Sequence, residues 1–258
     1  MTAQREQGGR RGLGVSGVPG VTAELHSTDD GAFALVVRAD TPLRALTSAV
    51  VGEGFVDARV VVNRQVSKRY DADDAEAEMR AFMARHPFVA AADAIGLLTA
   101  AHVRDFGYGE HPIADGRRVA AWATVGLGNA ARAGRRSPPA GGLFPGTINT
   151  IAVIDGDPSP GAFVAAAVVA AEAKAAALQA LGVRDDDDGG IATGTTTDAV
   201  VVAATRRGPP VRYAGTATLV GHAVGRAVYD AVRAAAEREF AAASADESPN
   251  EERCGTER

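Results

Sequence analysis

The sequence feature that most constrains the fold is an apolar strand followed by a long alanine-rich helix. Residues 148–154 read INTIAVI, a run of β-branched and apolar side chains that predicts a strand. The turn at residues 155–158, DGDP, ends this strand. Pro160 and Gly161 then open a helix that continues to Gly182.

Shorter periodic stretches surround this unit. Asp73 to Arg85 carries apolar side chains at helical spacing, and Pro87 stops the helix. A last helix is predicted within residues 215–240, where one stripe contains Leu219, Val224, Val228 and Val232. Short β-branched runs predict strands at residues 32–39, 58–62, 95–102, 120–125 and 197–205.

Strands interleaved with long helices indicate an α/β (α+β) protein. Because the strands do not alternate regularly with helices, we expect a single domain of stacked mixed β-sheets with helices packed outside. We expect residues 1–20 to form a flexible N-terminal arm and residues 21–240 to form the folded domain. The polar residues 241–258 are predicted to be a disordered tail.

Composition and charge exclude several classes of function. The formal net charge of −5 argues against a nucleic-acid partner, which favours a basic surface. Cys254 is the single cysteine, so neither a disulfide framework nor a thiolate zinc site can form. The longest apolar stretch, residues 163–183, is interrupted by Glu172, Lys174 and Gln179, and no signal segment is evident. We therefore expect a cytoplasmic protein with no membrane partner.

Common catalytic and binding motifs are missing. The sequence contains no HExxH, no G-x-S-x-G elbow and no Walker-type phosphate loop. A GxGxxG pattern at Gly12, Gly14 and Gly17 lies in the predicted arm with no strand before it, so it does not indicate a dinucleotide site. The four consecutive aspartates at residues 185–188 predict a solvated turn. No metal site is expected, because ligand spacing is absent among His26, His86, His102, His111 and His222.

Three hydroxyl- and glycine-rich junctions remain as candidates for a site. They are residues 124–130 (TVGLGNA), 145–150 (PGTINT) and 192–198 (ATGTTTD). Such segments can present backbone N–H groups and hydroxyls at strand ends, as a nucleophile and an oxyanion hole require. The alternative is ordinary turn chemistry, which uses the same residue types. We expect Thr147 and Asn149 of the second junction to line one cleft with Thr195, Thr196 and Asp198 of the third.

These junctions also belong to a series of ordered blocks that resembles a known family. The blocks run from about residue 43 to 235 and leave only the two tails uncovered: 46–54, 62–63, 124–127, 146–151, 172–178, 181–182, 192–199 and 213–216. Together they resemble the adenosylcobinamide amidohydrolase family. Glu53 and Gly128 depart from the pattern, in which we expect a small residue and a serine.

The resemblance implies a reaction and a ligand. The enzyme would hydrolyse the amide that joins the propionyl arm of the corrin ring to 1-amino-2-propanol, releasing adenosylcobyric acid for cobalamin salvage. The cobalt corrinoid would be the substrate and no separate cofactor would be needed. The sequence does not determine the oligomeric state, and a homo-oligomer is possible. It also does not determine whether the substrate is cobinamide or its phosphate.

A fainter resemblance bears on mechanism. Gly146-Thr147, ahead of an apolar strand that ends at Asp155, is similar to the self-processing junction of β-aminopeptidases and ornithine acetyltransferases. In those enzymes a freed N-terminal Ser or Thr attacks the acyl group. An upstream glycine-rich segment supplies their oxyanion hole, and residues 126–129 occupy the comparable place here.

Several residues follow as site candidates. For catalysis we expect Thr147 as nucleophile, Asn129 as oxyanion donor, and Glu172 or Asp198 as base. Substrate-binding candidates are Asn63, Gly146, Asn149, Thr150, Thr193, Gly194, Thr195, Thr196, Tyr213 and Thr216. Structural alternatives stand beside several of these roles: Glu172 as a solvated helix residue, Asn63 as a turn former, Tyr213 in the core, and His222 as a surface histidine rather than a base.

Two other functions stay open. The chain could be an N-terminal-nucleophile aminopeptidase or acyltransferase on small amides, which would require cleavage between Gly146 and Thr147. It could also be a corrinoid-binding protein without catalysis.

Overall fold

The computed structural model describes residues 10–89, 93–135, 146–185 and 187–246. The longer strands and the α-helices of these residues are β1 (Arg10–Val15), β2 (Val21–Ser27), β3 (Phe33–Thr47), β4 (Gly54–Gln65), α1 (Ala75–Arg85), β5 (Ala94–Thr99), β6 (Gly107–Pro112), β7 (Arg118–Val125), β9 (Ile148–Ile154), α2 (Pro160–Ala180), β12 (Ala199–Ala204) and α3 (Leu219–Asp246). Two short 3₁₀ helices are η1 (Pro87–Val89) and η2 (Val103–Asp105). Two-residue strands are β8 (Ala130–Ala131), β10 (Asp157–Pro158), β11 (Gly194–Thr195) and β13 (Pro210–Val211).

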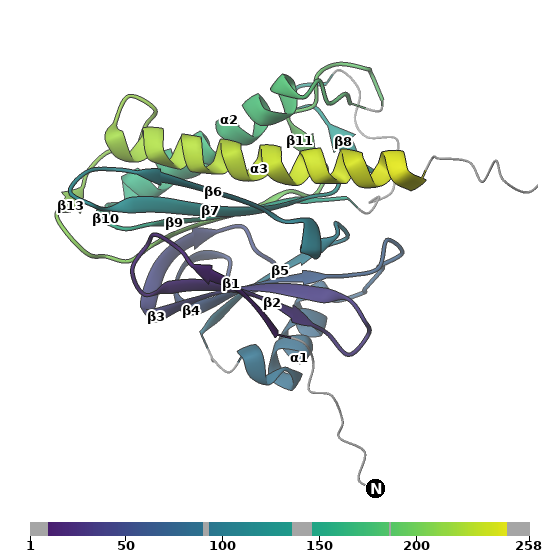
Figure 1. Cartoon of the computed structure of the whole chain (residues 1–258), viewed down its shortest axis with the longest axis horizontal. Coiled ribbons are helices and arrows are strands. Elements are labelled where there is room, and N and C mark those ends of the chain that lie inside the picture. Colours follow the sequence, from purple (N-terminus) through teal and green to yellow (C-terminus); the bar gives the residue numbers. More distant parts are fainter. Residues whose placement is uncertain (1–9, 90–92, 136–145, 186, 247–258) are drawn as a thin grey trace, which may run out of the picture.

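The long strand β3 folds one mixed sheet into two layers. The strand order is β1-β2-β3-β12-β9-β7-β6, and β4 and β5 extend from β3. The N-terminal half of β3 pairs with β2, and its C-terminal end, Arg44 to Thr47, pairs with β12. A register shift between Arg38 and Leu43 marks the change. Stacked layers with helices outside are visible in Figure 1, which confirms the predicted fold class.

Three apolar clusters hold the layers together. Between the two sheet layers, Leu35 and Val61 pack in one cluster with Trp122 and Ile151. Helix α1 covers the outer face of the first layer through Met79 and Phe82. Helices α2 and α3 cover the outer face of the second layer in the largest cluster. Each large apolar side chain buried in this way stabilises the fold by about 1.5–3 kcal/mol.

The predicted stripe of the last helix is correct with one exception. Val224, Val228 and Val232 have no exposed surface, but Leu219 is the first residue of α3 and is exposed. Helix α2 is long and apolar enough to cross a membrane by length and composition alone. In this fold it packs against α3 and the sheet through a buried alanine face, as the core helix of a globular domain does.

Both predicted tails need correction. Residues 10–15 form β1, which pairs antiparallel with β2, so the expected flexible arm includes a sheet strand and the residues after it. Val18 in the following turn is fully buried. At the other end, α3 continues to Asp246, beyond the predicted boundary at residue 240. Residues 1–9 and 247–258 lie outside the described residues.

Candidate active site

The candidate site lies where two parallel strands begin side by side. β9 and β12 pair in parallel, with Ala199 opposite Asn149 and Val200 opposite Thr150. Parallel neighbours start at the same edge of a sheet, so the segments just before them also lie together. The second and third junctions of the sequence therefore meet.

Side-chain alternation divides the strand residues between two faces. Ile148, Ala152 and Ile154 pack in the helix cluster, whereas Ile151 and Val153 pack between the sheets. Thr147 and Asn149 share the inter-sheet face, where they line a cavity. Thr150, a predicted substrate-binding residue, has the opposite parity and is absent from that lining.

Hydroxyl groups connect the two strand starts. Thr147 Oγ1 lies 2.8 Å from Thr197 Oγ1, and Thr197 Oγ1 donates to the Gly146 carbonyl at 2.6 Å. A hydroxyl has one proton and a carbonyl can only accept, so Thr147 must be the donor to Thr197. Thr195 Oγ1 is 3.5 Å from the same carbonyl but lies much closer to Asp198, to which it donates instead. Thr197 thus polarises the carbonyl that precedes Thr147.

The Asp198 carboxylate joins the same two segments. Its Oδ1 accepts from the backbone N–H of Ile148 at 3.0 Å, and its Oδ2 accepts from the N–H of Thr195 at 3.0 Å. Oδ2 also contacts Lys174 Nζ of α2 in an ion pair. Hydrogen bonds to a carboxylate are among the stronger ones in proteins, so Asp198 fixes the two strand starts relative to each other.

Asn129 lies directly beside the Gly146–Thr147 peptide. A Cβ atom on Gly146 would stand only 2.2 Å from Asn129 Oδ1, so glycine is required at this close approach. Asn129 Nδ2 donates to Thr196 Oγ1 at 2.7 Å. The amide of Asn129 therefore connects the first junction to the other two.

A buried amide network lies below the site, between the sheet layers. Asn149 Nδ2 donates to the Leu98 carbonyl and to Asn63 Oδ1, each at 2.9 Å. Asn63 Nδ2 donates in turn to Thr124 Oγ1 at 2.9 Å. Because the Leu98 carbonyl can only accept, it fixes the orientation of the Asn149 amide. Asn63 supports Asn149 and is not a turn former.

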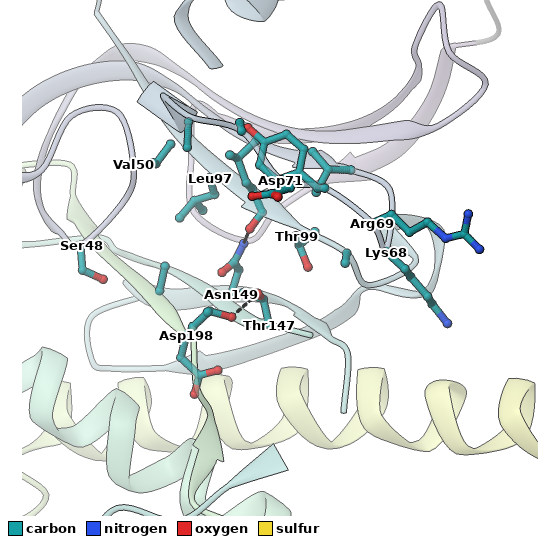
Figure 2. Close-up of a pocket in the computed structure, with 18 residues that line it drawn as sticks. Ser48, Val50, Lys68, Arg69, Asp71, Leu97, Thr99, Thr147, Asn149 and Asp198 are labelled. Carbon is teal, nitrogen blue, oxygen red and sulfur yellow. Dashed lines mark hydrogen bonds between the residues drawn. The ribbon is translucent and has the colours of Figure 1, made fainter. Parts of the chain in front are cut away.

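Thr147, Asn149 and Asp198 lie together at one wall of a cavity of about 850 Å³. Figure 2 shows them opposite Val50, Leu97 and Asp71, with Lys68 and Arg69 at one side. Burial and then the Glu78 carboxylate raise the pKa of the lining Tyr70 to about 12, so its phenol is protonated at neutral pH. The full lining is Ser48, Val50, Val66, Lys68, Arg69, Tyr70, Asp71, Ala72, Ala75, Leu97, Leu98, Thr99, Ala100, Thr147, Asn149, Thr197, Asp198 and Ala199.

The family model described as adenosylcobinamide amidohydrolase, CbiZ, matches residues 21–244. The chain belongs to this amidohydrolase family. The ordered sequence blocks therefore identified the family correctly.

Solved structures give a more distant likeness. A Burkholderia sp. beta-aminopeptidase is 16% identical, each chain covers 84% of the other, and the TM-score is 0.49. The PH0078 protein from Pyrococcus horikoshii OT3 is 10% identical, with 84% of each chain covered and a TM-score of 0.47. No curated protein matches the sequence.

Three residues that we predicted for the site, Glu172, Thr216 and Tyr213, do not line the cavity of Thr147. Glu172 and Thr216 line a separate cavity of about 350 Å³ between α2 and α3, together with His222. Tyr213 is 66% exposed, with the Arg212 guanidinium over its ring. The helical phase of α2 directs Glu172 to solvent, away from Thr147, so it cannot act as base there.

The remaining candidates line a second cavity, of about 430 Å³, which shares Asp198 with the first. Thr193, Gly194, Thr195 and Thr196 are found there. Of the five residues that we expected in one cleft, Thr147, Asn149 and Asp198 line the first cavity, whereas Thr195 and Thr196 line only the second. Thr193 Oγ1 accepts from the N–H of Ala133 at 2.9 Å, which is a structural role. Among the residues that the structure describes, no cluster of three His, Cys, Asp or Glu side chains could hold a metal.

Sequence reasoning missed two residues, Thr197 and Lys174. Thr197 belongs to the third junction but was not among the individual site candidates, although residues 147 and 197 have equivalent positions before paired strands. Parallel pairing could have suggested it. Lys174 lies two residues from Glu172 on α2 and so on a different face of the helix, where its ammonium group pairs with Asp198.

Proposed function

We propose that this chain hydrolyses the amide between the corrin propionyl arm and 1-amino-2-propanol of adenosylcobinamide, giving adenosylcobyric acid. Membership of the amidohydrolase family supports this. The assignment to a site rests on Thr147, which lines the cavity of about 850 Å³ and whose hydroxyl is hydrogen-bonded to Thr197.

The proposed chemistry proceeds in two steps through an ester. Thr147 Oγ1 attacks the carbonyl carbon of the substrate amide, its proton passes to the leaving nitrogen, and the amino alcohol departs. Water then hydrolyses the ester, releasing the carboxylic acid and restoring the Thr147 hydroxyl. Backbone N–H groups beside Thr147 would stabilise the oxyanion in both steps. Asn129, our predicted donor, does not line this cavity: its Nδ2 donates to Thr196 and its Oδ1 faces Gly146. Asp198 stays a candidate for holding the proton, whereas Glu172 does not, because it faces another cavity.

The shape of the cavity suits one arm of a large ligand. Cavities of about 300–1,000 Å³ hold drug-sized groups, so a corrinoid would insert the amide arm and leave its ring at the rim. Val50, Val66 and Leu97 give this cavity an apolar wall, and Asn149 gives it a polar floor. We further propose that the enzyme is cytoplasmic, acts in cobalamin salvage, uses the corrinoid as substrate and needs no other cofactor.

Release of aminopropanol tests the proposal. Purified wild-type protein is incubated with adenosylcobinamide, and both aminopropanol and adenosylcobyric acid are quantified by mass spectrometry. Stoichiometric release of the two products, absent with heat-denatured protein, is the expected result. A tight coloured complex with unchanged substrate would instead indicate a corrinoid-binding protein without catalysis.

A second candidate, the N-terminal nucleophile, is favoured by one observation. The Gly146 carbonyl accepts from Thr197 at 2.6 Å and directly precedes the Thr147 hydroxyl. Attack of Thr147 Oγ1 on this carbonyl would break the Gly146–Thr147 peptide bond, leaving an ester and a free α-amine on Thr147 that can act as base. Water would then hydrolyse the ester to the Gly146 carboxylate and restore the Thr147 hydroxyl. A denaturing gel and mass spectrum would show two fragments that meet between residues 146 and 147. A single intact chain with full activity would refute this route.

A further inference from the structure

An ion pair joins helix α2 to the residue just before β12, on the side of this segment that faces away from the Thr147 hydroxyl. Lys174 Nζ contacts Asp198 Oδ2, and each side chain is only 16% exposed. Along β12, Val202 and Ala204 pack in the helix cluster, so Asp198, of the same parity, is directed toward α2. Thr197 has the opposite parity and contacts Thr147. One short segment thus presents its hydroxyl to the cavity and its carboxylate to Lys174.

The residue at position 194 leaves space for this pair. A Cβ atom on Gly194 would lie 2.2 Å from Asp198 Oδ2 and 2.6 Å from Lys174 Nζ. Any side chain there would displace the carboxylate or the ammonium group. The absence of a side chain at Gly194 therefore makes room for the Lys174–Asp198 ion pair.

Other cations near Lys174 already have carboxylate partners. Arg132 and Arg135 line the same second cavity, but Arg132 Nη2 is 2.6 Å from Asp188 Oδ2, and Arg135 pairs with Asp187. Within the described parts of the chain, Lys174 is the only cationic side chain paired with Asp198. Loss of Lys174 would leave this largely buried carboxylate without its counter-charge, which is costly.

We propose that Lys174 is a positioning residue that holds Asp198 and, through it, aligns Thr147 with Thr197. This inference rests on the proposed role of the Thr147 site. Asp198 binds the N–H of Ile148 and the N–H of Thr195, so a shift of the carboxylate moves both strand starts. Displacements of about 1 Å at a reacting group can cost on the order of 10²-fold in rate. Lys174 lines the second cavity and not the cleft of Thr147, so it need not touch the substrate.

The test replaces Lys174 by alanine, a strong helix former that keeps α2 intact. Lys174→Ala should lower kcat for aminopropanol release about 10²-fold and change KM by less than about threefold. Propylamine, which can enter the second cavity and replace the missing ammonium group, should restore kcat at least tenfold in a saturable manner. Propanol of the same size should not. The double variant with Asp198→Asn should be no slower than Asp198→Asn alone.

Glu172→Ala is the matched control, because it removes a charge from the same helix on the face away from the site. An unchanged kcat in Lys174→Ala, a loss that propylamine does not restore, or additive losses in the double variant would each overturn the inference. A merely structural lysine would not respond to a free amine.

A readout without the corrinoid separates this inference from the proposed function. Acetylation of Thr147 by p-nitrophenyl acetate is followed by peptide mass spectrometry. Faster labelling of wild type than of Lys174→Ala, with propylamine rescue, supports the positioning role even if adenosylcobinamide is not turned over. Equal labelling of the two proteins, or no labelling of wild type, overturns it.

Discussion

Replacing Thr147 by valine tests the nucleophile directly, because valine keeps the β-branched shape and removes only the hydroxyl. The structural cost should be small. Thr147 is 7% exposed, and its hydroxyl makes one described hydrogen bond, 2.8 Å to Thr197. The Thr197 proton is already donated to the Gly146 carbonyl, so no buried donor is left unpaired. The free energy of unfolding should fall by about 0.5–1.5 kcal/mol.

The catalytic cost should be much larger. If the hydroxyl attacks, kcat should fall at least about 10³-fold, which corresponds to about 4 kcal/mol in activation free energy. This exceeds the expected loss of stability severalfold, so slower chemistry and partial unfolding can be told apart. The assay measures steady-state release of aminopropanol beside a urea unfolding curve for each variant.

Thr147→Ser is the matched control, since it retains the hydroxyl and loses only a methyl group. It should stay within about tenfold of wild type. A folded Thr147→Val protein whose kcat is within tenfold of wild type would refute the nucleophile role. The hydroxyl would then only orient the substrate while another group activates water.

Three further predictions follow from the same geometry. Gly194→Ala should lower both kcat and the melting temperature, because the new Cβ would lie 2.2 Å from Asp198 Oδ2; an unchanged melting temperature would contradict the close approach. Glu172→Gln and Tyr213→Phe should each change kcat less than about twofold, since neither residue lines the Thr147 cavity, and a tenfold loss in either would restore its place in catalysis. Burial favours the neutral form of Asp185, but N–H groups of Asp187, Arg132 and Asp188 outweigh it and lower the pKa below the ordinary 3.8. Asp185→Asn should therefore destabilise the protein at pH 7, and urea unfolding should show this difference shrinking as the pH falls below about 4.

Local rules were sufficient for the elements whose signals lie within a few residues. Pro160 and the alanine run gave α2, which ends at Ala180, and Asp74 caps α1 by accepting from the N–H of Ala77. Such signals depend on backbone propensity and side-chain period, which neighbouring residues carry. The strand β1 was missed because its glycine- and arginine-rich sequence has no strand period, and pairing with β2 is what orders it.

The sequence by itself determined the family, the fold class and the candidate nucleophile, because ordered blocks and strand–helix periodicity are properties of the chain. Only the tertiary structure decided which candidates meet. It separated Glu172 and Thr216 from Thr147 and brought Thr197 to it. It also joined Lys174 to Asp198. Contacts between residues 24 to 86 positions apart, such as Lys174–Asp198 and Asn149–Asn63, depend on strand pairing and helix phase, which no local sequence window contains.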